Sequence, residues 1–186
     1  MTVIMENIKK SYGDKIVFDG FSSEIALDRP AVLMGESGIG KTTLVRMIAG
    51  LEKPDSGKII GVPKTVSFMF QEDRLLPWFT ARQNVEYVSD KRTAEIYLDS
   101  VFLSDELDTP VSRLSGGMKR RVALARALAY KSELVILDEP FKGLDAELKG
   151  KIIGLILSES EKRHFLAVTH EKEDAILLNA NIINIR

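Results

Sequence analysis

The sequence predicts an α/β fold with a mainly parallel sheet flanked by helices, an N-terminal antiparallel β part and an inserted helical subdomain. Three observations lead to this class. Short β-branched runs surround a Gly13-Asp14 pair near the N-terminus, the stretch from Thr80 to about Tyr130 is helical in pattern, and apolar runs alternate with helical patterns afterwards. Because continuous apolar strands separated by helices are buried on both faces, they are typical of a parallel sheet.

The first part of the chain consists mostly of strands. Gly13-Asp14 is a turn signal of the kind that joins two antiparallel strands. Further on, a glycine-rich loop follows an apolar strand and precedes a helix over residues 41–49, which Gly50 ends. The strands expected in this part are residues 2–8, 15–18, 21–27, 31–34, 58–60 and 65–70.

The middle and last parts differ in pattern. Thr80, Thr93 and Ser115 each precede a helical pattern and are expected to cap helices over 81–88, 94–102 and 116–129. The later elements are expected to be strands 134–137, 165–168 and 182–185 and helices 146–157 and 171–178. We expect a single domain, whose core comprises residues 1–71 and 133–186 and whose helical subdomain is an insertion at about 72–132.

Composition restricts the classes of function. The chain has 186 residues, of which 45% are hydrophobic and 28% charged, as suits one soluble domain. A net charge of -1 and a pI near 6.2 argue against a strongly basic surface, so we expect no nucleic-acid partner. The absence of cysteine excludes disulfides and thiolate metal sites. The N-terminus turns polar too early for a secretory signal, and no apolar run could cross a bilayer, so any membrane role must come through a partner.

The strongest local signal lies at residues 35–42, which read GESGIGKT. These residues match the motif of a phosphate-binding loop, and they have the expected context of a strand before the motif and a helix after it. Its glycines let backbone N–H groups turn toward phosphate oxygens, and the helix N-terminus adds positive potential. Lys41 is expected to reach the β- and γ-phosphates and the Thr42 hydroxyl to bind Mg²⁺. The plain structural alternative is a strand–turn–helix whose glycines only make the turn tight.

A second signal is the apolar strand LVIL at 134–137, followed by Asp138 and Glu139. In open α/β sheets, ligands bind at the carboxyl ends of strands, where the phosphate loop also begins. Asp138 is expected to hold magnesium through water, and Glu139 to orient or deprotonate the attacking water. His170 ends another strand at the same edge, where it could contact the γ-phosphate. Alone, the acids would be interpreted as exposed loop residues and the histidine as a surface or capping residue.

A third signal is Ser115-Gly116-Gly117, which opens a basic helix and forms a second potential anion site. Two phosphate-binding helix starts in one chain suggest that two copies share nucleotides. The alternative is a capped helix start with a solvated basic face. That face would carry Lys119, Arg120, Arg121 and Arg126.

These motifs resemble the ATP-binding cassette (ABC) ATPases, in the family's order and over essentially the whole chain. Walker A is 35–43, the Q-loop glutamine is Gln71, the signature is LSGGM at 114–118, Walker B with the catalytic glutamate is 134–140, the D-loop includes Asp145, and the switch histidine is His170. The resemblance implies that ATP and Mg²⁺ are the cofactors and that Glu139, His170 and Lys41 are catalytic. It places the metal at Thr42, Gln71 and, through water, Asp138. The implied nucleotide contacts are Tyr12, Gly35, Glu36, Ser37, Gly38, Ile39, Gly40, Lys41, Thr42, Thr43 and Gln71, with Ser115 and Gly117 contributed by the second copy.

The resemblance also implies partners. Two copies pack head to tail around ATP, and the helical subdomain docks on transmembrane permease subunits, which places the chain in the cytoplasm on the inner face of the cell membrane. Residues 71–78, QEDRLLPW, resemble the ATPases of bacterial importers for nitrate, sulfonates, taurine and thiamine precursors, so a solute-binding protein is expected in the same system. Trp78 is interpreted as part of the subunit contact or as core packing.

Three features of the sequence differ from the common pattern of the family. Met118 stands where glutamine is usual, the D-loop reads FKGLD, and the sequence ends soon after His170, so we expect no C-terminal regulatory domain. Tyr12, which would stack on adenine, is alternatively a plain tyrosine before a hairpin turn.

The competing functions are a soluble ABC ATPase without a membrane partner, and a P-loop kinase or GTPase. The LSGGM segment and His170 count against the second of these.

Overall fold

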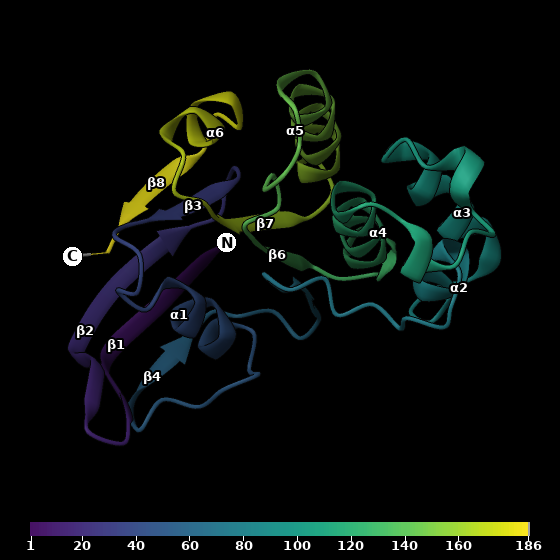
Figure 1. Ribbon diagram of the computed structural model, residues 1–186. Coiled ribbons are helices and arrows are strands. Elements are labelled where there is room, and N and C mark those ends of the chain that lie inside the picture. The colour runs from purple at the N-terminus through teal and green to yellow at the C-terminus, as the bar shows by residue number, and fades with distance from the viewer. Residues whose placement is uncertain (186) are drawn as a thin grey trace.

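The computed structural model describes residues 1–185 and contains two sheets (Figure 1). The antiparallel sheet has the strand order β2-β1-β4, and the parallel sheet has the order β5-β6-β7-β3-β8. The strands are β1 (Thr2–Tyr12), β2 (Lys15–Ala26), β3 (Ala31–Met34), β4 (Ser56–Ile60), β5 (Val66–Met69), β6 (Leu134–Asp138), β7 (His164–Val168) and β8 (Asn181–Asn184). The predicted fold class is confirmed.

The register of the parallel sheet determines where the site can form. Val168 on β7 is the pairing partner of both Asp138 on β6 and Leu33 on β3. The three segments that leave these strands therefore start from one edge of the sheet. They are the glycine-rich loop after Met34, the acidic pair at Asp138, and the segment that contains His170.

One face of the parallel sheet packs against α1 (Lys41–Ile48) and the antiparallel sheet. Alternation along the strands explains this, since Leu134, Ile136 and Val168 point to this face while their neighbours point to the other. The α1 helix buries Leu44, Val45, Met47 and Ile48 in this layer.

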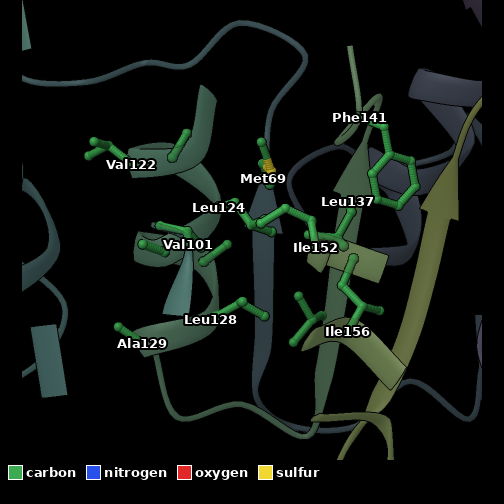
Figure 2. Packing of buried hydrophobic residues seen from close by; sticks show 14 of the residues in the cluster. Met69, Val101, Val122, Leu124, Leu128, Ala129, Leu137, Phe141, Ile152 and Ile156 are labelled. Atoms are coloured by element: carbon green, nitrogen blue, oxygen red, sulfur yellow. The ribbon is translucent and has the colours of Figure 1, made fainter. Parts of the chain in front are cut away.

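The other face packs against α4 (Gly116–Ala129) and α5 (Ala146–Ser160), as Figure 2 shows for Leu124, Leu128, Ile152 and Ile156 around Met69 and Leu137. The remaining helices are α2 (Ala81–Glu86), α3 (Lys91–Ser100) and α6 (Lys172–Leu177), with short 3-10 turns η1 (Ser104–Glu106) and η2 (Val111–Arg113). Both α2 and α3 contact α4 (Figure 1). The division into a core and a helical subdomain at about 72–132 stays a prediction.

The caps of the helices were predicted with one error. Thr80 caps α2 and forms a capping box with Gln83, and Ser115 caps α4. Thr93, however, does not cap α3. The cap is Asp90, whose carboxylate accepts the Thr93 N–H at 3.0 Å and the Thr93 hydroxyl at 2.7 Å, so the helix begins earlier than expected.

Two further differences concern strands and packing. The two strands expected at 15–18 and 21–27 form one strand, β2, because its pairing with β1 continues across Gly20 through local register shifts. Trp78 is 75% exposed, so its interpretation as a core residue is wrong. Within residues 1–185, no helix combines the length and apolar character that a membrane span needs.

Candidate active site

The glycine-rich loop connects β3 to α1 and curves around the ammonium group of Lys41. Lys41 Nζ donates to the carbonyl oxygens of Gly35 and Glu36, both at 2.8 Å. Gly38 and Gly40 adopt φ angles of 81° and 108°, which residues with a side chain rarely adopt. A Cβ on Gly40 would also lie 2.6 Å from Val17 Cγ1. The loop thus requires glycine at these positions for its shape, not only for flexibility.

The start of α1 offers N–H groups to a ligand. Its N-cap is Gly40, which has no side chain to accept them, and no side-chain cap bond is formed. Helix N-termini of this kind attract anions, because their free N–H groups and the helix dipole both favour negative charge. The loop can therefore cradle phosphate groups, with Lys41 at its centre.

Asp138 ends β6 and contacts the first turn of α1. It is 1% exposed, and its Oδ2 accepts the hydroxyl of Thr42 at 2.9 Å. Its Oδ1 is buried and has no hydrogen-bond partner among residues 1–185. Burial raises the pKa of the Asp138 carboxyl, and the Thr42 hydrogen bond opposes this shift.

This pair of oxygens fits a magnesium ion. Mg²⁺ prefers oxygen ligands and usually takes only one or two carboxylates besides phosphates and water. A buried carboxylate oxygen that lacks a partner, next to a hydroxyl, is therefore an appropriate anchor. Among residues 1–185 no cluster of three or more acidic, histidine or cysteine side chains could hold a metal by itself, so phosphates would have to supply further ligands.

Glu139 follows Asp138 and contacts His170. Nδ1 of His170 lies 3.1 Å from Oε2 and 3.2 Å from Oε1 of Glu139. Glu139 adopts a left-handed backbone conformation with φ of 53°, which is uncommon for a residue other than glycine and often marks a functional site. Its N–H donates to the carbonyl oxygen of Val168 at 2.9 Å.

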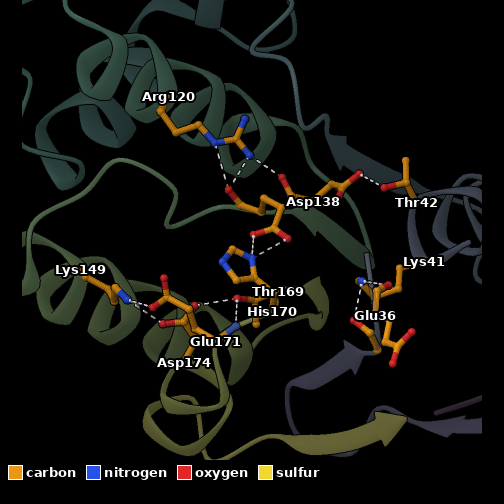
Figure 3. A network of polar contacts seen from close by, with 12 residues as sticks. Glu36, Lys41, Thr42, Arg120, Asp138, Lys149, Thr169, His170, Glu171 and Asp174 are labelled. Atoms are coloured by element: carbon orange, nitrogen blue, oxygen red, sulfur yellow. Dashed lines mark hydrogen bonds and ion pairs between the residues drawn. The ribbon is translucent and has the colours of Figure 1, made fainter. Parts of the chain in front are cut away.

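A buried ion pair braces the segment that carries His170 (Figure 3). Lys149 on α5 donates to Asp174 at 3.0 Å and to Glu171, and Asp174 accepts the hydroxyl of Thr169 at 2.8 Å. The hydrogen bond to Glu171 is the main cause that raises the pKa of Lys149, and it lowers the pKa of Glu171. The residues on either side of His170 are thus held to α5.

A cavity of about 280 Å³ brings the predicted residues together. Its lining residues are Ser37, Gly38, Gly40, Lys41, Thr42, Thr43, Gln71, Asp138, Glu139 and Val168. Gly35, Glu36 and Ile39 belong to the loop but do not line the cavity, and His170 reaches it through Glu139. A wider cavity of about 800 Å³ lies at the amino ends of β5, β6 and β7 and contains none of the predicted residues. We place the site at the smaller one, because phosphate-binding groups converge there.

Three further predicted contacts, which lie away from the loop, are also outside this cavity. Tyr12 ends β1, is 47% exposed and hydrogen-bonds Glu52 through its hydroxyl. Its contact with adenine stays a prediction. Ser115 and Gly117 open α4, where the Ser115 side chain accepts the Met118 N–H at 3.2 Å. Their absence from the cavity of their own chain is compatible with a role toward a second copy.

The interpretation of the basic residues of α4 as a solvated face is wrong for its arginines. Arg120 is only 4% exposed and donates to the carbonyl oxygens of Asp138 and Glu139. Arg121 and Arg126 likewise donate to backbone carbonyls. The burial of Arg120 could have been inferred from the sequence. Arg120 precedes the apolar residues Leu124 and Leu128 by about one and two helical turns and therefore lies on the same face of the helix.

The unpartnered oxygen of Asp138 leads to a prediction about stability. Asp138→Asn should raise the melting temperature of the nucleotide-free protein by about 2–4 °C. The reason is that the variant no longer buries a charged, unpaired oxygen, which costs the folded state about 1 kcal/mol. Because burial raises the Asp138 pKa, the folded state favours the protonated carboxyl, so the stabilisation should shrink as the pH falls and Asp138 becomes neutral. Thermal melts of both proteins at several pH values measure this.

If Asp138 anchors Mg²⁺, the same variant should lose the extra stabilisation that Mg²⁺ adds to ATP, because the anchoring carboxylate is gone. Melts with ATP and either Mg²⁺ or a chelator test this. Asp105→Asn, on the exposed η1 turn, is the matched control and should leave both effects as in the parent. A destabilised Asp138→Asn protein that keeps its full response to Mg²⁺ would contradict the metal assignment.

Comparisons with known proteins agree with this geometry. A family model described as ABC transporter matches residues 18–142. The aliphatic sulfonates import ATP-binding protein SsuB 3 of Paraburkholderia xenovorans is 40% identical over 192 residues, covering 100% of this chain and 77% of that protein. The bicarbonate transport ATP-binding protein CmpC of Synechococcus elongatus is 34% identical, covering 97% of this chain and 31% of that protein. Among solved structures, the ATP-binding cassette MJ0796, a dimer in a post-hydrolysis state with ADP and Pi, superposes with a TM-score of 0.88 at 27% identity, covering 99% of this chain and 94% of that one.

Proposed function

This chain belongs to the ABC transporter family of ATP-binding proteins, and from that membership we propose that it hydrolyses ATP to drive a membrane importer of a small solute. The observation that carries the proposal is the meeting of the phosphate loop, Asp138 and the Glu139–His170 pair at one cavity. The similarity to relatives named as sulfonate and bicarbonate transport proteins supports import of a small anionic solute.

In this proposal the loop from Gly35 to Thr43 binds the phosphates of ATP. Lys41 exchanges its two carbonyl partners for the β- and γ-phosphate oxygens, which bear more negative charge. The N–H groups at the start of α1 complete the cradle. Tyr12 stacks on the adenine from the end of β1.

Thr42, Asp138 and Gln71 would hold Mg²⁺ beside the phosphates. When bound, the metal supplies positive charge that screens the phosphate oxygens. For the chain, the consequence is that the buried Asp138 carboxylate gains the partner that its Oδ1 lacks. Gln71 lines the same cavity from the segment that follows β5.

Hydrolysis requires a base at the γ-phosphate. Glu139 accepts a proton from the attacking water, whose oxygen bonds to the γ-phosphorus while the bond from that phosphorus to the β–γ bridging oxygen breaks. The products are ADP and phosphate. His170 holds the carboxylate of Glu139 through Nδ1 and supports the γ-phosphate. The Lys149 ion pairs keep the His170 segment in place.

A second copy of the chain completes the site. Ser115 and Gly117 stand at an exposed helix start, away from the cavity of their own chain. We place them against the nucleotide bound by the other copy in a head-to-tail dimer, as supported by the dimeric state of the similar cassette MJ0796. ATP then holds two copies together until it is hydrolysed.

The remaining partners are transmembrane permease subunits and a solute-binding protein, and the chain sits peripherally on the cytoplasmic face of the membrane. The permease contact is assigned to the helical subdomain, whose first segment exposes Trp78. The Trp78 indole is 75% exposed and therefore offers apolar surface to a partner. A short segment of the chain connects Trp78 to Gln71 at the cavity.

Co-purification tests this function. A tagged chain expressed with the hydrophobic subunit encoded beside it should bring that subunit down in detergent, and the complex in lipid vesicles should hydrolyse ATP at a rate that depends on the partner. Trp78→Ala should weaken recovery of the partner, whereas Ile176→Ala, which removes another exposed apolar side chain on α6, should not. A solitary stable protein with full turnover and no partner would contradict transport and favour a soluble ABC ATPase.

A further inference from the structure

Arg120 is a buried cation on α4 that contacts the backbone of the active-site residues at the end of β6. Its side chain is 5% exposed and lies one turn into α4. Nε and Nη2 donate to the carbonyl oxygen of Glu139 at 3.2 and 2.7 Å, and Nη2 also donates to that of Asp138 (Figure 3). None of these bonds involves the carboxylates, so the guanidinium fixes the backbone that carries them.

The same guanidinium reaches a second strand end. Nη1 donates to the carbonyl oxygens of Phe70 and Gln71 at 2.7 and 3.0 Å and pairs with Asp73 Oδ1 at 3.1 Å. Phe70 and Gln71 directly follow β5, and Asp138 ends β6. One side chain therefore joins the carboxyl ends of two neighbouring strands to α4.

The backbone of Glu139 needs such support. Its φ of 53° belongs to the left-handed region, which costs free energy for any residue with a Cβ and persists only where the surroundings impose it. Its N–H is held by Val168 at 2.9 Å, and its carbonyl oxygen is held by Arg120. Without the guanidinium, Glu139 has fewer constraints that keep its carboxylate beside His170.

We propose that Arg120 is a positioning residue for ATP hydrolysis, which sets the direction of the Glu139 carboxylate relative to the start of α4. The inference rests on the proposed function, because it assigns Arg120 a role through Glu139. Arg120 also connects two parts of the proposed site within one chain. The helix that presents Ser115 and Gly117 to the partner's nucleotide is bonded, one turn later, to the chain's own catalytic segment.

The first test is Arg120→Lys, which keeps the charge but loses the planar fork that serves several carbonyls at once. We expect kcat to fall by about 10- to 100-fold, as loss of groups that orient reactive side chains does, with little change in KM or ATP affinity. Arg121→Lys is the matched control. Arg121 is the next residue on the helix and donates to the carbonyls of Val101 and Phe102, away from the cavity. It should lower the melting temperature comparably while keeping kcat.

A double-mutant comparison separates positioning from general packing. If Arg120 acts through Glu139, then Arg120→Lys should not lower further the residual turnover of a Glu139→Gln protein. Effects that multiply, or an Arg120→Lys protein that behaves as Arg121→Lys does, would overturn the inference. In both cases a large loss in Glu139→Gln alone would leave the proposed function intact, whereas full turnover in Glu139→Gln would refute the role of Glu139 as the base.

If Arg120→Lys does not fold, Asp73→Asn provides the test, because it removes only the ion pair at the outer edge of the guanidinium. It should lower kcat by about 2- to 5-fold, the effect of one weakened charge-assisted contact, and again only when Glu139 is present. An Asp73→Asn protein with parental kcat, or with the same loss in the Glu139→Gln background, would overturn the proposal.

Discussion

Replacing Glu139 by glutamine should lower kcat for ATP hydrolysis by about 10²- to 10⁴-fold, the usual contribution of a general base. The amide has nearly the same shape but cannot accept the proton of the attacking water. ATP affinity should be almost unchanged, because Lys41, Thr42 and the phosphate loop remain. Phosphate release under saturating ATP and binding of a fluorescent ATP analogue measure the two quantities.

The geometry around Glu139 explains why the effect should be large. Glu139 lines the cavity together with Lys41 and Thr42, and its carboxylate lies within 3.2 Å of His170, which is the arrangement that we propose for attack at the γ-phosphate. Asp138 is 1% exposed and bonded to Thr42 in the first turn of α1, so it is the poorer candidate for a base that must reach a water molecule.

Glu133→Gln is a suitable control for the Glu139 variant. Glu133 immediately precedes β6, at the opposite end of the strand that Glu139 follows. Within the described part of the chain, its side chain accepts a hydrogen bond only from the Thr65 hydroxyl. The same change of charge should leave turnover at the parental value. A Glu139→Gln protein with undiminished kcat would refute the role of Glu139 as the base.

Replacing Lys41 by alanine should weaken ATP binding itself, by about 10- to 100-fold, because charge-assisted hydrogen bonds to the phosphates are lost. The change also leaves the carbonyls of Gly35 and Glu36 without their present donor. Turnover should fall with binding, unlike in the Glu139 variant. Titration with the fluorescent analogue, with and without Mg²⁺, gives the dissociation constants.

Lys91→Ala is the matched control for Lys41. Lys91 starts α3, has a 67% exposed side chain and lies far from the phosphate loop in the sequence. ATP affinity equal to that of the parent is expected. Parental affinity in Lys41→Ala itself would show that the phosphates bind elsewhere.

Much of the site could be predicted from the sequence because its signals are local. The phosphate loop depends on a few glycines, Lys41 and Thr42 within one short segment, and its context of strand and helix is visible in the pattern of apolar residues. Asp138 and Glu139 follow directly on an apolar strand. Since parallel strands end at one edge, the proximity of these acids to the loop follows from the pattern of strands alone.

The supporting contacts could not be predicted in the same way. Arg120 bonds Phe70 at a separation of 50 residues and Glu139 at a separation of 19, so nothing in its neighbours identifies its acceptors. The start of α3 was misplaced because Asp90 and Thr93 are both good caps, and only the backbone decides between them. The contact of Ser115 and Gly117 with a second copy follows from the family resemblance and stays a prediction, because one chain does not contain that partner.

We propose that the nucleotide lies between two copies of this chain. The molar mass of the Glu139→Gln protein, measured by light scattering with and without ATP and Mg²⁺, tests this arrangement. ATP should convert the 20.7 kDa chain into a species of twice that mass. Adding Gly117→Asp should prevent the conversion, because it places a negative charge at the helix start that meets the phosphates. Gly150→Asp, at an exposed position on α5 with open space around it, should not.

An ATP-bound Glu139→Gln protein that stays at the mass of one chain would contradict the shared site. So would a dimer that forms equally without nucleotide, or one that Gly117→Asp leaves intact.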